Sequence, residues 1–80
     1  MPRYYFNIQD GQTIFDDEGM ELDDMQAVKE EAVKSSADLL KSLQGPEFWR
    51  GEPWRLWVSD QPNGGGSTIL TLTFSARTAA

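Results

Sequence analysis

The sequence contains no cysteine and no histidine among its 80 residues. Without cysteine, neither a disulfide nor a thiolate metal site can reinforce so small a domain. Without histidine, the chain lacks the usual general base near neutral pH and the commonest metal ligand. Mechanisms of the Ser-His-Asp or Cys-His type are therefore excluded. We expect no enzyme, no catalytic residue, no metal ligand and no cofactor.

Positive charge is also scarce, because seven Lys and Arg residues stand against thirteen Asp and Glu residues, for a net charge of −6. That average field repels a phosphate backbone and makes nucleic acid a disfavoured partner. No apolar run approaches the roughly 18 residues of a membrane span. Met1-Pro2-Arg3 leads at once into an alternating stretch instead of a signal-peptide apolar segment. We expect one cytoplasmic domain over residues 1–80.

One long amphipathic helix is predicted over residues 23–44. Asp23 is a suitable N-cap, and Gln26 follows three residues later as in a capping box. Gly45-Pro46 is a strong stop signal. Apolar and small residues recur at helical spacing and form one face, which we expect to be buried: Met25, Val28, Ala32, Ser36, Leu39 and Leu43.

Alternating residues before and after this helix predict strands over residues 3–9, 13–15, 54–60 and 68–74. Asp10-Gly11 joins the first two strands as a hairpin turn. Whether Ile14 or Phe15 is buried stays open, because a shift of one residue in register exchanges the two. Residues 61–66, with three glycines, are expected to form a long flexible hairpin loop, and residues 75–80 a frayed tail.

The order of these elements predicts an α+β fold of the ββαββ type. Two hairpins would form a four-stranded, mostly antiparallel sheet with one helix packed on one face. Two hairpins joined by a helix permit more than one strand order, so the order stays open. The expected core draws apolar residues from every element: Tyr4, Phe6, Ile8, Leu22, Met25, Val28, Ala32, Leu39, Leu43, Trp54, Leu56, Val58, Leu70, Leu72 and Phe74.

Residues 16–24 hold six acidic residues, with Gly19 in their midst. This pattern favours a turn or bulge at Gly19, followed by a short extended piece that leads to the helix cap. The alternative is a small-ligand or cation-binding domain in which the carboxylates hold Ca²⁺ or Mg²⁺, although their spacing does not match an EF-hand loop. An enzyme would need a carboxylate-only site such as Asp16, Asp17 and Glu18.

Large apolar residues outside the expected core indicate a contact surface. Four residues on the sheet face turned away from the helix are the candidate partner surface: Tyr5, Arg55, Trp57 and Ile69. Such a patch on an exposed face is typical of interfaces, and Trp, Tyr and Arg are enriched at their hot spots. We therefore expect a non-catalytic interaction or regulatory module that binds a protein partner or forms a symmetric dimer.

Other interpretations of these apolar residues stay open. Trp57 would also be satisfied by lying flat over neighbouring Thr and Arg side chains. Nucleic-acid contact through Arg3, Tyr5 and Arg55 is a further use of the same face. Phe48 and Trp49 lie in a Gly- and Pro-containing stretch, residues 45–53, and form either a lid over one end of the core or a binding patch.

Several motifs occur together along nearly the whole chain. They are Pro2-Arg3-Tyr4-Tyr5-Phe6, Asp10-Gly11, Asp17-Glu18-Gly19-Met20-Glu21-Leu22, Trp54-Arg55-Leu56 and Leu70-Thr71-Leu72. In these motifs the chain resembles a family of short bacterial proteins of unknown function. The resemblance implies a ββαββ domain and neither an activity nor a functional residue. The chain departs from the family at Asn7, where members often carry histidine, and at residues 64–66, where the glycines extend a turn that is usually shorter.

Overall fold

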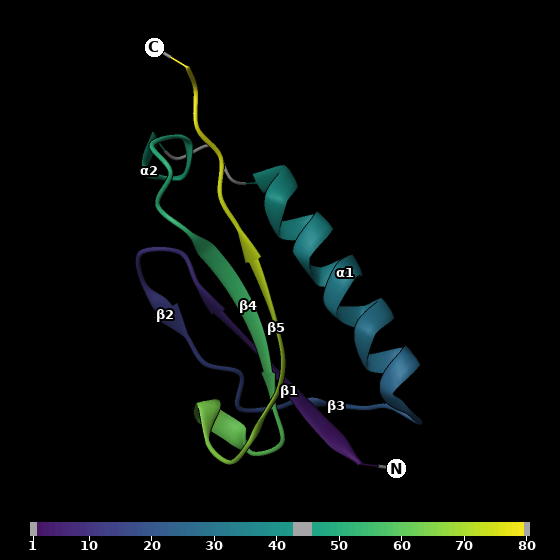
Figure 1. Cartoon of the computed structure of the whole chain (residues 1–80). Helices are drawn as coiled ribbons and strands as arrows, with labels where there is room; N and C mark the ends of the chain where they lie inside the picture. The colour runs from purple at the N-terminus through teal and green to yellow at the C-terminus, as the bar shows by residue number, and fades with distance from the viewer. Residues whose placement is uncertain (1, 43–45, 80) are drawn as a thin grey trace.

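The computed structural model describes residues 2–42 and 46–79 and confirms the α+β class. One long helix lies along one face of an antiparallel sheet (Figure 1). The strands are β1 (Arg3–Gln9), β2 (Thr13–Ile14), β3 (Met20–Glu21), β4 (Trp54–Ser59) and β5 (Thr68–Phe74). The helical elements are α1 (Met25–Ser42), α2 (Pro46–Trp49) and the 3₁₀ turn η1 (Pro62–Gly64).

The sheet has the order β2-β1-β4-β5, which the sequence left open. β4 pairs antiparallel with β1 and with β5, so the last two strands form the predicted hairpin. The short β3 is a fifth strand that the sequence did not predict, and it pairs with the start of β1. The expected count of four strands is therefore wrong, because Met20–Glu21 pairs with Arg3 and Tyr4 instead of remaining a free connection.

The first hairpin has the register Ile8↔Ile14, which settles the open choice between Ile14 and Phe15. Ile14 shares the side of the sheet on which Ile8 packs toward the core, although Ile14 itself is 54% exposed. Phe15 lies beyond the end of β2 and is 50% exposed. The register therefore buries neither of them fully, because β2 is short and lies at the rim of the sheet.

Five residues from α1 and β4 form the fully buried core: Val28, Ala32, Trp54, Leu56 and Val58. Partly buried side chains from β1, α1, α2 and β5 pack around them, and most of these belong to the predicted core. The prediction of Met25 as a core residue is wrong, because Met25 lies in the first helical turn and stays 41% exposed. Leu43 lies outside the described residues. Ile69 and Phe48 join the core cluster from outside the expected set.

The ends of α1 and the later connections differ from expectation. The N-cap is Asp24 and not Asp23, because the Asp24 carboxylate accepts a hydrogen bond from the Ala27 N–H at 2.9 Å. The Gly- and Pro-containing stretch after the helix, whose composition is typical of a loop, contains the short helix α2. The tail is not wholly frayed, because Arg77 forms a β-bridge with Arg50.

Candidate interaction surface

Asp16 fills a gap in the pairing of β1, between the residues that pair with β2 and those that pair with β3. Its carboxylate accepts the Phe6 N–H at 3.0 Å, in the place where a neighbouring strand would offer a carbonyl. The other carboxylate oxygen accepts the N–H groups of Glu18 and Gly19 at 3.0 and 3.1 Å, which makes a local turn. The first acid of the acidic run therefore serves as a structural acceptor for three backbone donors.

The surroundings of Asp16 favour its charged form. Partial burial opposes ionisation, but three backbone N–H groups and the Arg3 guanidinium outweigh it and hold the pKa of Asp16 below its usual 3.8. Among the described residues, which include all of 16–24, no group of three or more acidic side chains could hold a metal ion. The geometry of Asp16 thus suits N–H donors, and the acidic run does not converge on one point.

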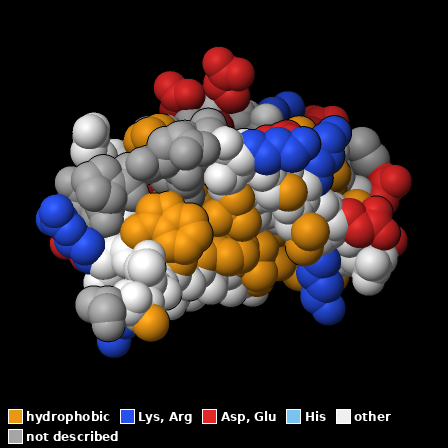
Figure 2. Space-filling view, turned by 90° about the horizontal axis from the view of Figure 1, so that it is seen from above, with side chains coloured by type: hydrophobic (Ala, Val, Ile, Leu, Met, Phe, Trp, Pro, Cys, Tyr) orange, Lys and Arg blue, Asp and Glu red, His pale blue; other side chains and the backbone are white. Residues whose placement is uncertain are grey.

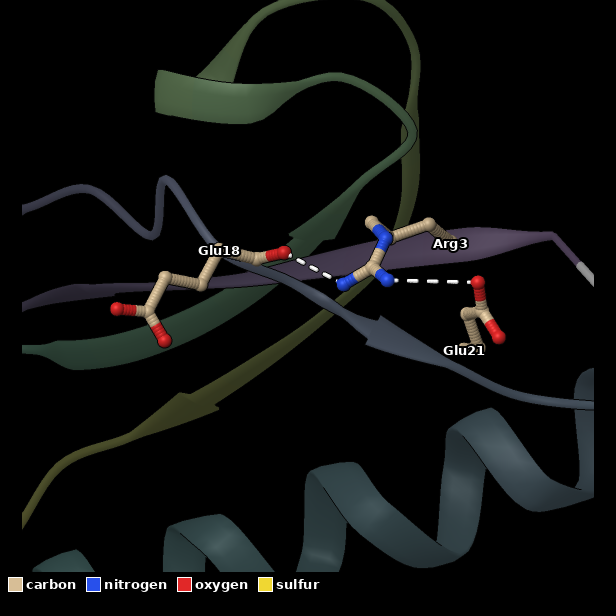
Figure 3. A network of polar contacts seen from close by, with 3 residues as sticks. All are labelled: Arg3, Glu18 and Glu21. Carbon is tan, nitrogen blue, oxygen red and sulfur yellow. Dashed lines mark hydrogen bonds and ion pairs between the residues drawn. The ribbon is translucent and has the colours of Figure 1, made fainter.

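Arg3 and Gly19 complete this turn. The Arg3 guanidinium donates to the Glu18 carbonyl at 2.7 Å and pairs with the Glu21 carboxylate at 3.3 Å, as Figure 3 shows. Gly19 has a φ of +73°, and a Cβ there would lie 2.7 Å from a ring carbon of Tyr5. Only glycine fits both the backbone conformation and the close approach to Tyr5. The expected turn at Gly19 is confirmed, and Arg3 is used within the domain.

Asn7 is the centre of a buried polar network that sequence reasoning missed. It is 0% exposed, although the alternation in β1 placed it on an open face. Its amide nitrogen donates to the Ser59 hydroxyl at 3.0 Å and to the Trp57 carbonyl at 3.3 Å. Its oxygen accepts the Asp16 N–H at 3.0 Å. Asn7 therefore ties β1 to β4 and to the acidic turn.

Two connections cover part of the sheet face that was expected to be open. The Asn63 N–H donates to the Asp16 carbonyl at 3.0 Å, which holds η1 against the acidic turn. Phe15 lies edge-on to Trp57 with ring centroids 6.1 Å apart. A Cβ at Gly64 would lie only 2.6 Å from the Phe15 ring. The glycine-rich connection therefore forms the predicted hairpin loop between β4 and β5, and its turn η1 packs against this face.

Trp57 is half-buried under these groups, so it is only partly exposed on the face where the contact surface was expected. The Arg55 guanidinium lies 5.3 Å from the centre of the Trp57 ring. Arg55 also donates to the Gln9 side chain at 2.7 Å while staying exposed itself. Trp57 thus contacts Arg55 on the sheet and Phe15 from the connection, and the Arg55 contact agrees with the interpretation in which the indole lies against neighbouring side chains.

The remaining two residues of the expected surface are also half-buried. Tyr5 lies under Gly19, and Ile69 packs against the core cluster near the register shift at Val58 and Ser59. A large apolar side chain that does stay exposed beside this face is that of Phe15, whereas the exposed Ile14 lies on the opposite side of the sheet, together with Ile8. We therefore define the aromatic face as Phe15, Trp57 and Arg55.

A second apolar area lies at the end of the molecule that carries α2. Figure 2 shows hydrophobic side chains gathered on this end, beside atoms that are not described. Trp49 is 52% exposed and lies edge-on to the half-buried Phe48, with ring centroids 5.9 Å apart. Phe48 packs on the core, as expected of a lid, whereas most of Trp49 does not. Phe48 thus agrees with the lid interpretation, and a binding role for Trp49 stays a prediction.

Comparison with known proteins gives one match. The family model described as "Domain of unknown function (DUF6894)" matches residues 3–75, which is consistent with the resemblance drawn from the sequence motifs. Neither the curated proteins nor the solved structures yield a significant match. In the part of the chain that the structure describes, no helix has the length and apolar character needed to cross a membrane.

Proposed function

The chain belongs to the DUF6894 family, whose description assigns no activity, and we propose from its own structure that it is a non-catalytic module that binds a protein partner in the cytoplasm. The observation that carries this proposal is the exposed Phe15 ring, which lies edge-on to Trp57 beside the exposed Arg55. Aromatic residues and arginine are the types enriched at interface hot spots. Exposed apolar side chains grouped in this way favour a contact role.

The chemistry of the chain supports a role in binding and not in catalysis. No residue can act as a histidine base or a cysteine nucleophile. The carboxylate with the lowered pKa, Asp16, is occupied by backbone N–H groups and is therefore a poor proton acceptor. The aromatic face offers instead a rigid surface, because Phe15 and Trp57 are held by η1 and β4.

Capture of partners from the native host with two matched variants tests this proposal. Phe15→Ala removes the exposed ring of the aromatic face, whereas Trp49→Ala removes an equally exposed ring at the other end. We expect Phe15→Ala to release proteins that the wild type and Trp49→Ala both retain. Loss of the same proteins from Trp49→Ala, with full retention by Phe15→Ala, would contradict the proposal. Circular dichroism of both variants checks that the fold is kept.

A further inference from the structure

The outer edge of β5 has no partner strand among the described residues, because β5 is the last strand in the order β2-β1-β4-β5. Residues 68–74, Thr-Ile-Leu-Thr-Leu-Thr-Phe, contain no charge and no proline. Proteins usually protect a long edge strand with lysine, proline or a covering segment, because its free N–H and C=O groups pair readily with another strand. Beyond the register shift near Ile69, the edge lacks such protection, and its regular part from Leu70 to Phe74 favours strand pairing.

The hydrogen-bonding directions along the sheet show which residues of β5 face outward. The Phe6 N–H points to Asp16, away from β4, so Tyr5 and Asn7 direct their backbone groups toward β4. The partners of Tyr5 and Asn7 on β4 are Ser59 and Trp57, so Leu56 and Val58 direct their backbone groups to the other side, toward β5. Their partners on β5, Leu72 and Leu70, therefore direct their backbone groups toward β4. Thr71 and Thr73 therefore present their N–H and C=O groups at the free edge.

We propose that β5 pairs antiparallel with β5 of a second copy of this chain, about a two-fold axis at Thr71, to form one continuous sheet. Thr71 would face its own copy as a hydrogen-bonded pair, and Thr73 would face Ile69. Leu70 would then lie opposite Leu72 on the side of the sheet that carries α1, so apolar residues meet apolar residues. The strand is thus close to self-complementary about its central residue.

The flank of α1 on the β5 side supports a second copy as the partner. Phe6 directs its side chain toward the core and its N–H toward the β2 edge. When an L-residue in an upward-running strand has its side chain toward the viewer, its N–H points to the right. Seen from α1 with β1 running upward, the β2 edge is therefore on the right and β5 is on the left. α1 also runs upward, alongside β1 and β5 (Figure 1). In a right-handed helix so placed, the flank to the left of the buried stripe carries Gln26, Lys29, Val33, Ala37 and Leu40.

That flank contains no acidic residue, although the chain carries a net charge of −6. Val33 is 61% exposed there, more than any other large apolar residue described. Two acidic copies would repel each other through most surfaces. The electrostatic repulsion between two copies is weakest where they approach through β5 and this flank, because neither carries an acidic residue. The flank also adds apolar contact area, since a stable interface needs more than one strand pair.

This inference is independent of the proposed function, because the aromatic face and the β5 edge are different surfaces. The chain lacks cysteine, so a single introduced cysteine can form a disulfide only between two molecules. In a hydrogen-bonded pair the two Thr71 Cα atoms would lie about 5.5 Å apart, within disulfide range. The two Thr73 Cα atoms would lie about 14 Å apart, too far to bridge. Thr71→Cys should cross-link on mild oxidation, and Thr73→Cys should not.

Sedimentation at several protein concentrations completes the test. We expect the wild type to be dimeric, and Thr71→Lys or Val33→Glu to be monomeric with unchanged circular dichroism. Phe15→Ala should stay dimeric, which separates this interface from partner binding through the aromatic face. A wild type that is monomeric at every concentration would overturn the proposal. A dimer that persists in Thr71→Lys, or equal cross-linking of Thr71→Cys and Thr73→Cys, would overturn it as well.

Discussion

Asp16→Asn tests whether the first acid of the acidic run stabilises the fold. The carboxylate accepts three backbone N–H groups, two through one oxygen and the Phe6 N–H through the other. A carboxamide has a single oxygen and can keep the local turn only by presenting its NH₂ group to the Phe6 N–H. One part-buried donor then loses its acceptor, which costs about 1–3 kcal/mol. A domain of 80 residues has a total stability of only about 4–12 kcal/mol.

The effect of Asp16→Asn should be visible in urea unfolding followed by tryptophan fluorescence. A loss of about 2 kcal/mol corresponds to a fall of about 8–16 °C in the melting temperature of a domain this size. Asp17→Asn is the matched control, since Asp17 is exposed and lies outside this hydrogen-bond network, and it should unfold like the wild type. Equal urea midpoints for Asp16→Asn and the wild type would refute the structural role given to this carboxylate.

The same carboxylate gives a pH dependence with a definite sign. Because the pKa of Asp16 is lower in the folded state than its usual 3.8, the unfolded state binds the proton more readily. Its contribution to stability is therefore complete above the unfolded pKa and is lost as the pH falls through the lower, folded pKa. The stability difference between the wild type and Asp16→Asn should shrink over this acidic range. A difference that stays constant down to the lowest pH would contradict this linkage.

Three further changes test the structure around this turn. Gly19→Ala should destabilise the domain by more than about 1 kcal/mol in urea unfolding, because it adds a Cβ 2.7 Å from the Tyr5 ring at a φ of +73°. Asn7→Ala should cost about 1–3 kcal/mol by the same measurement, because the buried Ser59 hydroxyl and the Asp16 N–H lose a partner. Millimolar Ca²⁺ or Mg²⁺ should leave the melting temperature unchanged, and a rise of several degrees that Asp17→Asn abolishes would restore the cation site.

The alternation of apolar residues predicted the main elements well. In β4, Trp54, Leu56 and Val58 alternate with Arg55, Trp57 and Ser59. The first three were predicted to face the core, and all three are buried. The helical spacing of Val28, Ala32 and Ser36 likewise identified the buried face of α1. These patterns are local, so the sequence carries them without knowledge of the tertiary structure. Strand order is not local, and only the pairing of β1 with β4 settled it.

The candidate surface was less predictable, because what covers a sheet face comes from distant segments. Asn7 is polar and alternates outward, yet it is buried by residues 9 and 52 positions away, namely Asp16 and Ser59. Contacts at these sequence separations do not affect the alternation of polar and apolar residues within a strand, so the pattern could not predict them. A signal was present in Asp16, Glu18 and Gly19, since an Asp before a glycine is typical of a turn closed by its own side chain. That turn lies over Tyr5 and reduces the exposure assigned to the face.

The most direct test of the proposed function uses the side-chain N–H signals of the three tryptophans. A ¹⁵N-labelled domain would be titrated with the partner that Phe15→Ala fails to retain, and followed by NMR. Trp57 lies in the aromatic face, Trp54 is buried in the core and Trp49 lies at the α2 end. The account predicts that the indole signal of Trp57 and the backbone amide signals of Ile14 and Phe15 shift. Shifts confined to Trp49, or none at Trp57, would contradict it.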